Sequence, residues 1–362
     1  MNPNPELSPR ILLMGCGAVG GVIAAGLLES GYDVTLVTHN ESISSAIATH
    51  GLRAVTPHGT HPLSPKMCAA LTHSDLTSVS GSFDIVLLAM KATGVEAAAR
   101  RVQRMLAPDA IVVTLQNGIV EDLVASIVGR ERVIGALVGW GATMHGPGIY
   151  ERTSRGEMTI GELNGRTTER VQRLKTLLDA AAPTAVSTNI YGALWSKLAI
   201  NCVVTTFGAT TGQLLGQMLR LAGIRRLALS VISEVIDVAT ALGVTLEPVG
   251  GTLDLQRLYL PPSRRDSRLR LSAIPKHAII GLVGLKFRKL KSSMLQSLER
   301  GREPEIDFLN GYVVERGREN GVSTPVNAAL TTMVQQIVCG ERQIRPQNLE
   351  ELWKQPYSLL YQ

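Results

Sequence analysis

The sequence predicts an α/β domain with a parallel sheet, followed by a second domain built of helices alone. Short apolar runs alternate with helical patterns over the first half of the chain, which is typical of parallel βαβ units. A glycine-rich turn directly follows the first apolar run, and from Tyr191 onward long helical patterns replace the strand candidates. A chain of 362 residues is long enough for two domains, which we place at 1–189 and 190–362.

Apolar runs bounded by turn residues predict the strands of the first domain, at 10–15, 33–38, 83–90, 110–116, 132–138 and 185–188. Segments with apolar residues at helical spacing lie between them, and helices are expected at 20–30, 95–106, 120–128 and 169–182. Two further runs, 148–153 and 156–163, are expected to pair with each other and close the sheet. In the second domain, 214–242 should form one or two long helices and 303–320 another.

Composition and charge indicate a folded protein and argue against a nucleic-acid-binding surface. The net charge is +6, and the segment 250–291 carries ten lysine or arginine residues against two acidic ones. This segment has few aromatic residues that could stack on bases, which argues against nucleic-acid binding. Two interpretations of it stay open. Its basic residues, among them Arg264, Arg265 and Arg270, form either a solvated face or a lid that attracts an anionic substrate or cofactor.

Neither the N-terminus nor any apolar window predicts a signal peptide or a membrane span. The four cysteines have no CxxC spacing and no ligand-like spacing to histidines: Cys16, Cys68, Cys202 and Cys339. We therefore expect no metal site and no disulfide framework, and we expect the protein in the cytoplasm.

The glycine-rich turn "GCGAVG" spans residues 15–20 and has the form GxGxxG between a predicted strand and a predicted helix. Gly15 permits a tight turn, Gly17 lets the backbone approach a pyrophosphate, and Gly20 lets helix and strand pack closely. The helix N-terminus offers N–H groups to the anion. This context predicts a Rossmann-type dinucleotide site formed by residues 15–20, namely Gly15, Cys16, Gly17, Ala18, Val19 and Gly20.

The end of the second strand bears on which dinucleotide binds. An NAD site usually carries an acidic residue there, and this chain has Thr38-His39-Asn40 instead. The sequence therefore favours NADP, although no arginine for the 2′-phosphate is present either and NAD stays open as the alternative.

The stretch "ALWSKLAINCVVTT", residues 193–206, predicts a buried helix with one polar stripe. Lys197, Asn201 and Thr205 recur every fourth position, while apolar residues cover the rest of the helix surface. A lysine on an apolar helix suggests a catalytic or binding role, with a lysine that merely reaches out to solvent as the alternative.

Six motifs in order resemble the ketopantoate reductases, the 2-dehydropantoate 2-reductases of pantothenate and coenzyme A synthesis. They are "GCGAVGG", "LLAMKA", "LQNG", "WSKLAINC", "KSSMLQSLERG" and "EIDFLNGYVV". The likeness extends from the first strand to about Thr324. It implies a helical second domain like the C-terminal domain of 6-phosphogluconate dehydrogenase.

The resemblance also implies roles for individual residues. Lys197 matches the catalytic proton donor, and Glu305 matches a glutamate near the nicotinamide ribose and the reacting groups. Asn201 and Ser293 match substrate-binding residues. On the cofactor side the matches are Lys91, Asn117 and a backbone contact at Ala142, and Asn117 also borders the substrate.

Three departures from the family pattern lie on the substrate side. Thr205 stands where the family often has a second asparagine, so we expect it to bind substrate through a hydroxyl. The stretch "FRKLKSS" lacks another asparagine that some members carry before the paired serines, and the span 243–292 is longer than usual. The substrate of this chain can therefore differ from that of the family.

The expected reaction is NADPH-dependent reduction of 2-dehydropantoate to (R)-pantoate, with a hydride from the nicotinamide and a proton from Lys197. Two alternatives stay open, which are reduction of another 2-keto acid on the same fold and a sensor that binds NADP(H) without catalysis. A small 2-keto acid is the expected partner, with a homodimer as a candidate assembly, and no nucleic acid or membrane. The sequence leaves the true substrate and the oligomeric state open.

Overall fold

The computed structural model describes residues 9–57, 59–64, 68, 72–248, 253–262 and 274–354. The chain divides into two compact units. Unit 1 comprises Met1–Gln116 and Val120–Tyr191, and unit 2 comprises Asn117–Ile119 and Gly192–Gln362. The short loop Asn117–Ile119 thus groups with the helical unit although it follows a strand of unit 1.

Unit 1 is built on an eight-stranded, mostly parallel sheet with the strand order β12-β11-β8-β7-β6-β1-β2-β5. Strands from β8 to β5 are parallel, whereas β11 runs antiparallel to β8 and pairs in parallel with β12. The strands span Ile11–Met14 (β1), Val34–Val37 (β2), Thr72–His73 (β5), Phe83–Leu88 (β6), Leu106–Thr114 (β7), Val133–Val138 (β8), Met158–Glu162 (β11) and Thr184–Val186 (β12).

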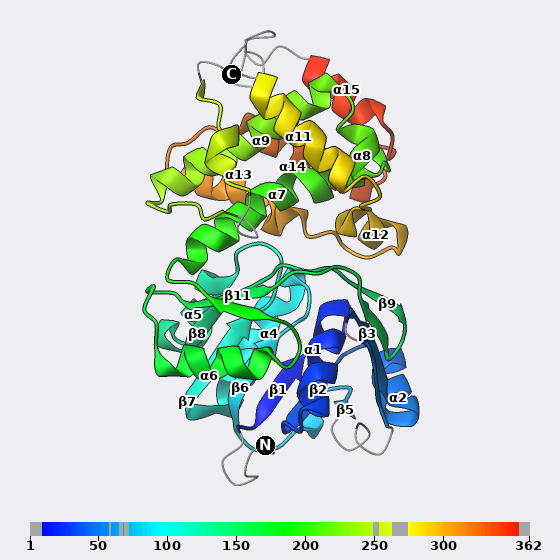
Figure 1. The fold of residues 1–362 in the computed structure, drawn as a ribbon, viewed down its shortest axis with the longest axis vertical. Helices are drawn as coiled ribbons and strands as arrows, with labels where there is room; N and C mark the ends of the chain where they lie inside the picture. Colours follow the sequence, from blue (N-terminus) through cyan, green and yellow to red (C-terminus); the bar gives the residue numbers. More distant parts are fainter. Residues whose placement is uncertain are drawn as a thin grey trace. The chain divides into compact units, whose positions relative to one another are not determined.

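Helices cover both faces of this sheet, which is why every residue of the central strand β1 is buried. On one face α1 (Ala18–Glu29) packs against α6 (Glu169–Leu178). On the other face α4 (Val95–Val102) packs against α5 (Glu121–Val128), as Figure 1 shows. The predicted α/β class with a mostly parallel sheet is confirmed.

A second, four-stranded sheet lies against α1 on the side away from the large sheet. Its strand order is β4-β3-β10-β9, with β3 at Leu52–Thr56, β4 at Gly59–Leu63, β9 at Ala142–Gly146 and β10 at Ile149–Arg152. The α1 helix is therefore enclosed between two sheets, and its residues from Gly20 to Ala25 are buried.

The expected pairing of 148–153 with 156–163 is wrong. The first run is β10, which pairs with β9 and β3 in the small sheet, and the second is β11, which joins β8 and β12 in the large sheet. The hairpin partner of β10 is β9, through a turn in which Gly148 has φ 77°. Alternation identifies a strand, but it does not identify the neighbour with which the strand exchanges hydrogen bonds.

Several elements between 41 and 82 escaped the sequence prediction, namely helix α2 (Glu41–His50) and strands β3, β4 and β5. The Asn40 side chain caps α2 by accepting hydrogen bonds from the backbone N–H groups of Ser42 and Ile43. Only Ile43 and Ile47 supply buried apolar side chains to this helix, so its periodic signal is weak. Two boundaries also shift, since α1 begins at Ala18 and β7 at Leu106.

Unit 2 is helical, as predicted. Its described helices are α7 (Ile190–Thr211), α8 (Leu215–Met218), α9 (Ala222–Ala241), α11 (Ile274–Lys286), α12 (Ser293–Glu299), α13 (Asn310–Glu319), α14 (Pro325–Val338) and α15 (Gln347–Lys354). The α9 helix contacts α11, α13, α14 and α15 and forms the centre of the unit. The segment 214–242 forms two helices.

The helix expected at 303–320 is interrupted. A 3₁₀ turn, η8 (Ile306–Phe308), precedes α13, and Leu309 between them has φ −112° and ψ −100°, outside the helical region. Apolar spacing continues through this break, so periodicity alone does not reveal it.

Among the described residues, α7 is the one helix long and apolar enough to cross a membrane. Within its most apolar window, 72% of the residues are buried in the protein. It is a buried core helix.

Candidate active site

The glycine-rich turn has the geometry of a phosphate-binding loop. Gly15 has φ +99°, and a Cβ on it would lie 2.6 Å from the backbone nitrogen of Met90. A Cβ on Gly20 would lie 1.9 Å from the carbonyl oxygen of Gly15. Around Gly17, in contrast, a Cβ would meet no atom of the described chain within 4 Å. Gly15 and Gly20 are therefore required by the fold, whereas Gly17 borders open space.

The start of α1 leaves backbone N–H groups for a ligand. Gly17 is its N-cap, and within the described chain no side chain caps it. Gly17, Ala18 and Val19 are each half-buried rather than fully enclosed. An uncapped helix N-terminus beside an open glycine is suited to a pyrophosphate, so these residues fit a dinucleotide cofactor.

Tyr150 of β10 binds the backbone of this turn. Its ring is fully buried, and its hydroxyl donates a hydrogen bond of 2.8 Å to the carbonyl oxygen of Cys16. A Cβ on Gly21 would lie 2.3 Å from that ring, which explains the second glycine in "VGG". Burial raises the pKa of the Cys16 thiol to about 12, so this side chain is a packed core group rather than a reactive one. Sequence reasoning missed Tyr150, because its partners lie far away along the chain.

The carboxyl end of β6 lies beside the glycine turn. Lys91 follows this strand, is half-buried and precedes a short 3₁₀ turn (Ala92–Gly94). Gln116 donates from Nε2 to the carbonyl oxygens of Leu88 and Met90, at 2.8 and 3.1 Å. These bonds hold the backbone against which Gly15 packs.

The residues after β2 carry no carboxylate. Thr38 is buried and donates its backbone N–H to the carbonyl oxygen of His73 at 3.1 Å, while His39 and Asn40 are exposed. Because Asn40 caps α2, its amide oxygen is already engaged. Ala142 opens β9 and packs, half-buried, on the core around α1.

Unit 2 contains the second group of expected site residues. Lys197 and Asn201 are half-buried on α7, together with Ile200 and Val204, and they form the accessible stripe of an otherwise buried helix segment. Thr205 is different, because it is only 7% exposed and its hydroxyl donates 2.7 Å to the carbonyl oxygen of Asn201.

The paired serines at the start of α12, Ser292 and Ser293, differ in burial and in bonding. Ser292 is the buried N-cap, accepting the N–H of Leu295 at 3.0 Å and donating 2.6 Å to the carbonyl oxygen of Thr205. Ser293 is the first residue of the helix and is exposed. Ser292 therefore caps the helix, whereas Ser293 is left at the surface of unit 2.

Glu305 and Asn117 belong to the same unit as Lys197. Glu305 is half-buried and precedes η8. Asn117 is half-buried, and the next residue, Gly118, has φ +89°. A Cβ on Gly118 would lie 2.4 Å from the carbonyl oxygen of Phe308, so the "LQNG" loop packs directly against η8. The motifs around Asn117 and Glu305 are therefore neighbours in space.

A buried polar network behind α7 was not predicted. Glu234 on α9 accepts hydrogen bonds from the backbone N–H groups of Val326 and Asn327, at 3.1 and 3.0 Å, and from Asn327 Nδ2 at 2.7 Å. Asn327 Oδ1 accepts from Asn310 Nδ2 at 2.9 Å, and Asn310 Oδ1 accepts from the Thr206 hydroxyl at 2.5 Å. This chain of bonds joins α7 to α9, α13 and α14. Polar residues inside apolar helices are the one sequence signal that could have pointed to it.

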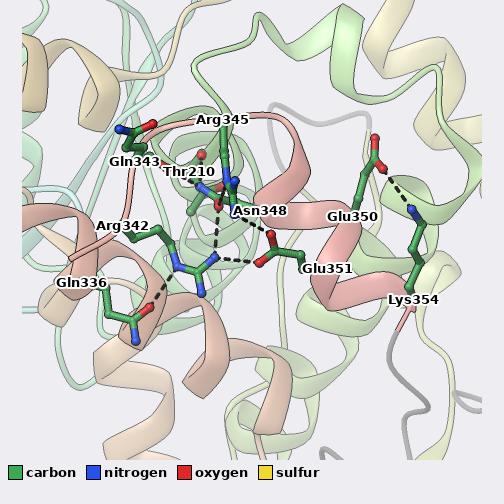
Figure 2. A network of polar contacts seen from close by, with 9 residues as sticks. All are labelled: Thr210, Gln336, Arg342, Gln343, Arg345, Asn348, Glu350, Glu351 and Lys354. Atoms are coloured by element: carbon green, nitrogen blue, oxygen red, sulfur yellow. Dashed lines mark hydrogen bonds and ion pairs between the residues drawn. The ribbon is translucent and has the colours of Figure 1, made fainter. Parts of the chain in front are cut away.

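The C-terminal end of α7 is bound by α15 and the turn before it, as Figure 2 shows. Asn348 Nδ2 donates 2.8 Å to the carbonyl oxygen of Thr210, the penultimate residue of α7. Arg342 and Arg345 both bind the Glu351 carboxylate, at 2.9 and 2.8 Å. The C-terminal half of the helix that carries Lys197 is therefore positioned by hydrogen bonds to α13 and α15.

A cavity of about 990 Å³ in unit 1 lies elsewhere. It is lined by residues near the amino ends of β6, β7 and β8, including Asp84, Asp109 and Arg132. Open α/β sheets bind their ligands at the carboxyl ends of the strands, where the glycine turn lies. We therefore assign no part of the dinucleotide site to this cavity.

Two expectations from the sequence concern a metal site and the basic segment 250–291. Among the described residues no group of three or more His, Cys, Asp or Glu side chains could hold a metal ion. Arg264, Arg265 and Arg270 of the basic segment lie outside the described residues. In its described part, Lys291 pairs with Glu299 at 2.7 Å and Lys276 donates to the carbonyl oxygen of Tyr259 at 2.5 Å.

Comparison with known proteins connects both units to one family. The model of the N-terminal part of the ketopantoate reductases PanE/ApbA matches residues 11–165, and the model of their C-terminal part matches residues 189–338. The 2-dehydropantoate 2-reductase of Mesorhizobium japonicum is 29% identical over 351 residues, which cover 91% of this chain and 97% of that protein.

Solved structures agree on the fold. The PanE/ApbA family ketopantoate reductase of Ralstonia eutropha JMP134 has a TM-score of 0.74 at 29% identity, covering 92% of this chain and 100% of that one. D-mandelate dehydrogenase, in a ternary structure with NADH and anilino(oxo)acetate, has a TM-score of 0.76 at 20% identity, covering 91% of this chain and 99% of that one. The chain is an oxidoreductase that belongs to the ketopantoate reductase family.

Proposed function

We propose that the protein reduces 2-dehydropantoate, or a similar branched 2-keto acid, to the 2-hydroxy acid, with NADPH as reductant. For 2-dehydropantoate the product is (R)-pantoate. The observation that carries this proposal is the accessible stripe on α7, where Lys197 and Asn201 lie on an otherwise buried helix. The C-terminal end of that helix is held by the hydrogen bond from Asn348 to Thr210. In a family of keto acid reductases, a lysine in that position is suited to act on a carbonyl oxygen.

The chemistry requires a proton donor at the oxygen that becomes negative. A nicotinamide held through the glycine turn would supply the hydride for the carbonyl carbon. The Lys197 ammonium hydrogen-bonds the carbonyl oxygen, stabilises its growing charge and donates the proton. Asn201, one turn further along α7, orients the substrate through its amide, and the exposed Ser293 hydroxyl binds the carboxylate. Glu305 and Asn117 lie in the same unit and border the reacting groups.

The cofactor proposal rests on the glycine turn and on the end of β2. Residues 15–20 would hold the pyrophosphate, and Lys91, Asn117 and Ala142 are the further residues that we expect to contact the dinucleotide. We propose NADPH because no carboxylate at residues 38–40 would repel a 2′-phosphate. NADH is the second candidate, since the solved relative D-mandelate dehydrogenase carries it. We assign residues 1–189 to the cofactor domain and 190–362 to the substrate domain.

Steady-state kinetics test the proposal. Purified protein is assayed with 2-dehydropantoate and a panel of 2-keto acids, each with NADPH and with NADH. We expect turnover with at least one branched 2-keto acid and a lower KM for NADPH. Cofactor binding without turnover on any keto acid would instead support a non-catalytic NADP(H) sensor.

Assembly and location follow as further proposals. We propose a cytoplasmic enzyme, because all four cysteines are free, three of them buried. A homodimer is the assembly we expect, and light scattering on the purified protein measures it directly.

A further inference from the structure

The hydroxyl of Thr205 is committed to its own helix. A threonine hydroxyl has a single proton to donate, and here that proton lies on a 2.7 Å bond to the carbonyl oxygen of Asn201, four residues earlier. The residue is only 7% exposed. The Thr205 hydroxyl therefore has no proton left to donate to a substrate along the accessible stripe of α7, and its low exposure restricts its oxygen as an acceptor.

The neighbouring hydroxyl of Ser292 is committed as well. Its proton is donated to the carbonyl oxygen of Thr205 at 2.6 Å, and its oxygen accepts the N–H of Leu295. A Cβ on Gly208 would lie 2.3 Å from the Ser292 Cβ, so α12 is pressed against α7 and this bond cannot open without moving a helix. Both hydroxyls beside this turn of α7 are thus used within the protein.

Apart from Lys197 and Asn201, the side chains that α7 presents there are apolar. Ile200 and Val204 are half-buried and flank Asn201, and Lys197 completes the stripe. One ammonium and one amide suffice for a keto group and its immediate neighbours. The rest of this surface offers branched hydrocarbon to the substrate side chain, where a hydroxyl would lose its hydrogen bonds to water.

We infer that this chain acts on 2-keto acids whose side chain is branched and apolar, and that Thr205 determines this preference by withholding its hydroxyl. The inference rests on the proposed function and narrows its substrate class. The reaction is R–CO–COO⁻ + NAD(P)H + H⁺ → R–CHOH–COO⁻ + NAD(P)⁺, in which the cofactor is oxidised and the keto carbon is reduced. The C4 hydroxyl of 2-dehydropantoate contributes little to its recognition by this chain.

Two acids that differ by that hydroxyl alone make the comparison direct. They are 2-dehydropantoate and 3,3-dimethyl-2-oxobutanoate, which is the same acid without the oxygen on C4. A site built to bind a substrate hydroxyl rejects the analogue without it by about 10⁴-fold or more, whereas an apolar pocket discriminates by about 10²-fold at most. We expect the deoxy acid to have a kcat/KM at least equal to that of 2-dehydropantoate.

Two variants test the part played by position 205. Thr205→Asn supplies an amide that reaches further than the hydroxyl, and it should raise the ratio of kcat/KM for 2-dehydropantoate over the deoxy acid by about tenfold or more. Thr205→Val keeps the branched outline without the hydroxyl and should leave that ratio within about threefold of wild type, because the hydroxyl proton is already used on the carbonyl oxygen of Asn201.

The outcomes separate the two proposals. If wild type prefers 2-dehydropantoate by about 10³-fold or more, or if Thr205→Val alone abolishes such a preference, the inference is wrong while the proposed reductase activity stands. If neither acid nor any other 2-keto acid is turned over, the proposed function fails. Calorimetry with pantoate and its deoxy analogue on the NADP⁺-loaded enzyme then still compares the two side chains, and tighter binding of pantoate, or no binding of either, overturns the inference.

Discussion

Glu121 should make the stability of unit 1 depend on pH near neutrality. Its side chain is 1% exposed at the start of α5. One carboxylate oxygen accepts from the Thr114 hydroxyl at 2.8 Å, and the other accepts from the backbone N–H of Val120 at 2.9 Å. Burial raises the pKa of Glu121 from 4.5 to about 7, because these two hydrogen bonds only partly replace the lost hydration of the charged form.

The size of the effect follows from this difference between folded and unfolded chain. The folded state binds the proton more tightly, so the favourable contribution is complete below about pH 4.5 and is lost as the pH rises to about 7. Each pKa unit corresponds to about 1.36 kcal/mol, so the rise from 4.5 to about 7 lowers the free energy of unfolding by about 3 kcal/mol once the pH is above 7. Above neutral pH the folded protein must carry a buried carboxylate at that cost.

Glu121→Gln removes the charge and preserves the shape. The amide oxygen can accept the Val120 N–H, and the amide nitrogen can donate to Thr114, whose hydroxyl already lies 3.5 Å from the carbonyl oxygen of Ile134. We expect the variant to unfold at nearly the same urea concentration as wild type at about pH 5 and to be up to about 3 kcal/mol more stable at about pH 8.5. Circular dichroism during urea denaturation measures this difference at each pH.

Glu157→Gln is the matched control, since Glu157 is an exposed glutamate of the same unit. Its profile of stability against pH should follow wild type throughout. A Glu121→Gln variant whose stability also follows wild type at every pH would refute the assignment of a buried, high-pKa carboxyl at this position.

Three further predictions concern the site, and a fourth concerns the cysteines. Lys197→Met should lower kcat by about 10² to 10⁴-fold, the usual contribution of a positioned proton donor, while the Kd for NADPH measured by fluorescence stays within about threefold; retained turnover removes Lys197 from this role. Gly17→Ala should fold normally, because its φ is −75° and a Cβ meets open space, yet bind NADPH about tenfold or more weakly because the methyl group occupies the pyrophosphate position. Gly15→Ala should instead lower the melting temperature of the protein, since φ is +99° and Met90 blocks the Cβ; equal behaviour of the two glycine variants contradicts this distinction. Of the four cysteines, Cys339 alone is exposed, so a thiol reagent should modify one group in the native protein and four after denaturation; rapid loss of more than one native thiol would disagree with the burial described.

The sequence by itself determined the class of the fold and indicated the two places where we propose that chemistry occurs. Both follow from local patterns, because apolar periodicity shows which face of a helix or strand is buried. A glycine motif between strand and helix is equally local, and so is the four-residue spacing between a lysine and an asparagine on one helix. Short stretches of the chain therefore suffice to locate the turn at 15–20 and the polar stripe of α7.

The tertiary structure decided how distant segments meet. It placed β10 in the small sheet rather than beside β11, set Tyr150 beneath the glycine turn, and packed the Asn117 loop against η8. It also showed that the Thr205 hydroxyl, which the resemblance placed on the substrate side, donates to the carbonyl oxygen of Asn201 in its own helix. Hydrogen-bond partners and close approaches depend on which elements pack together, and no short pattern along one chain encodes that choice.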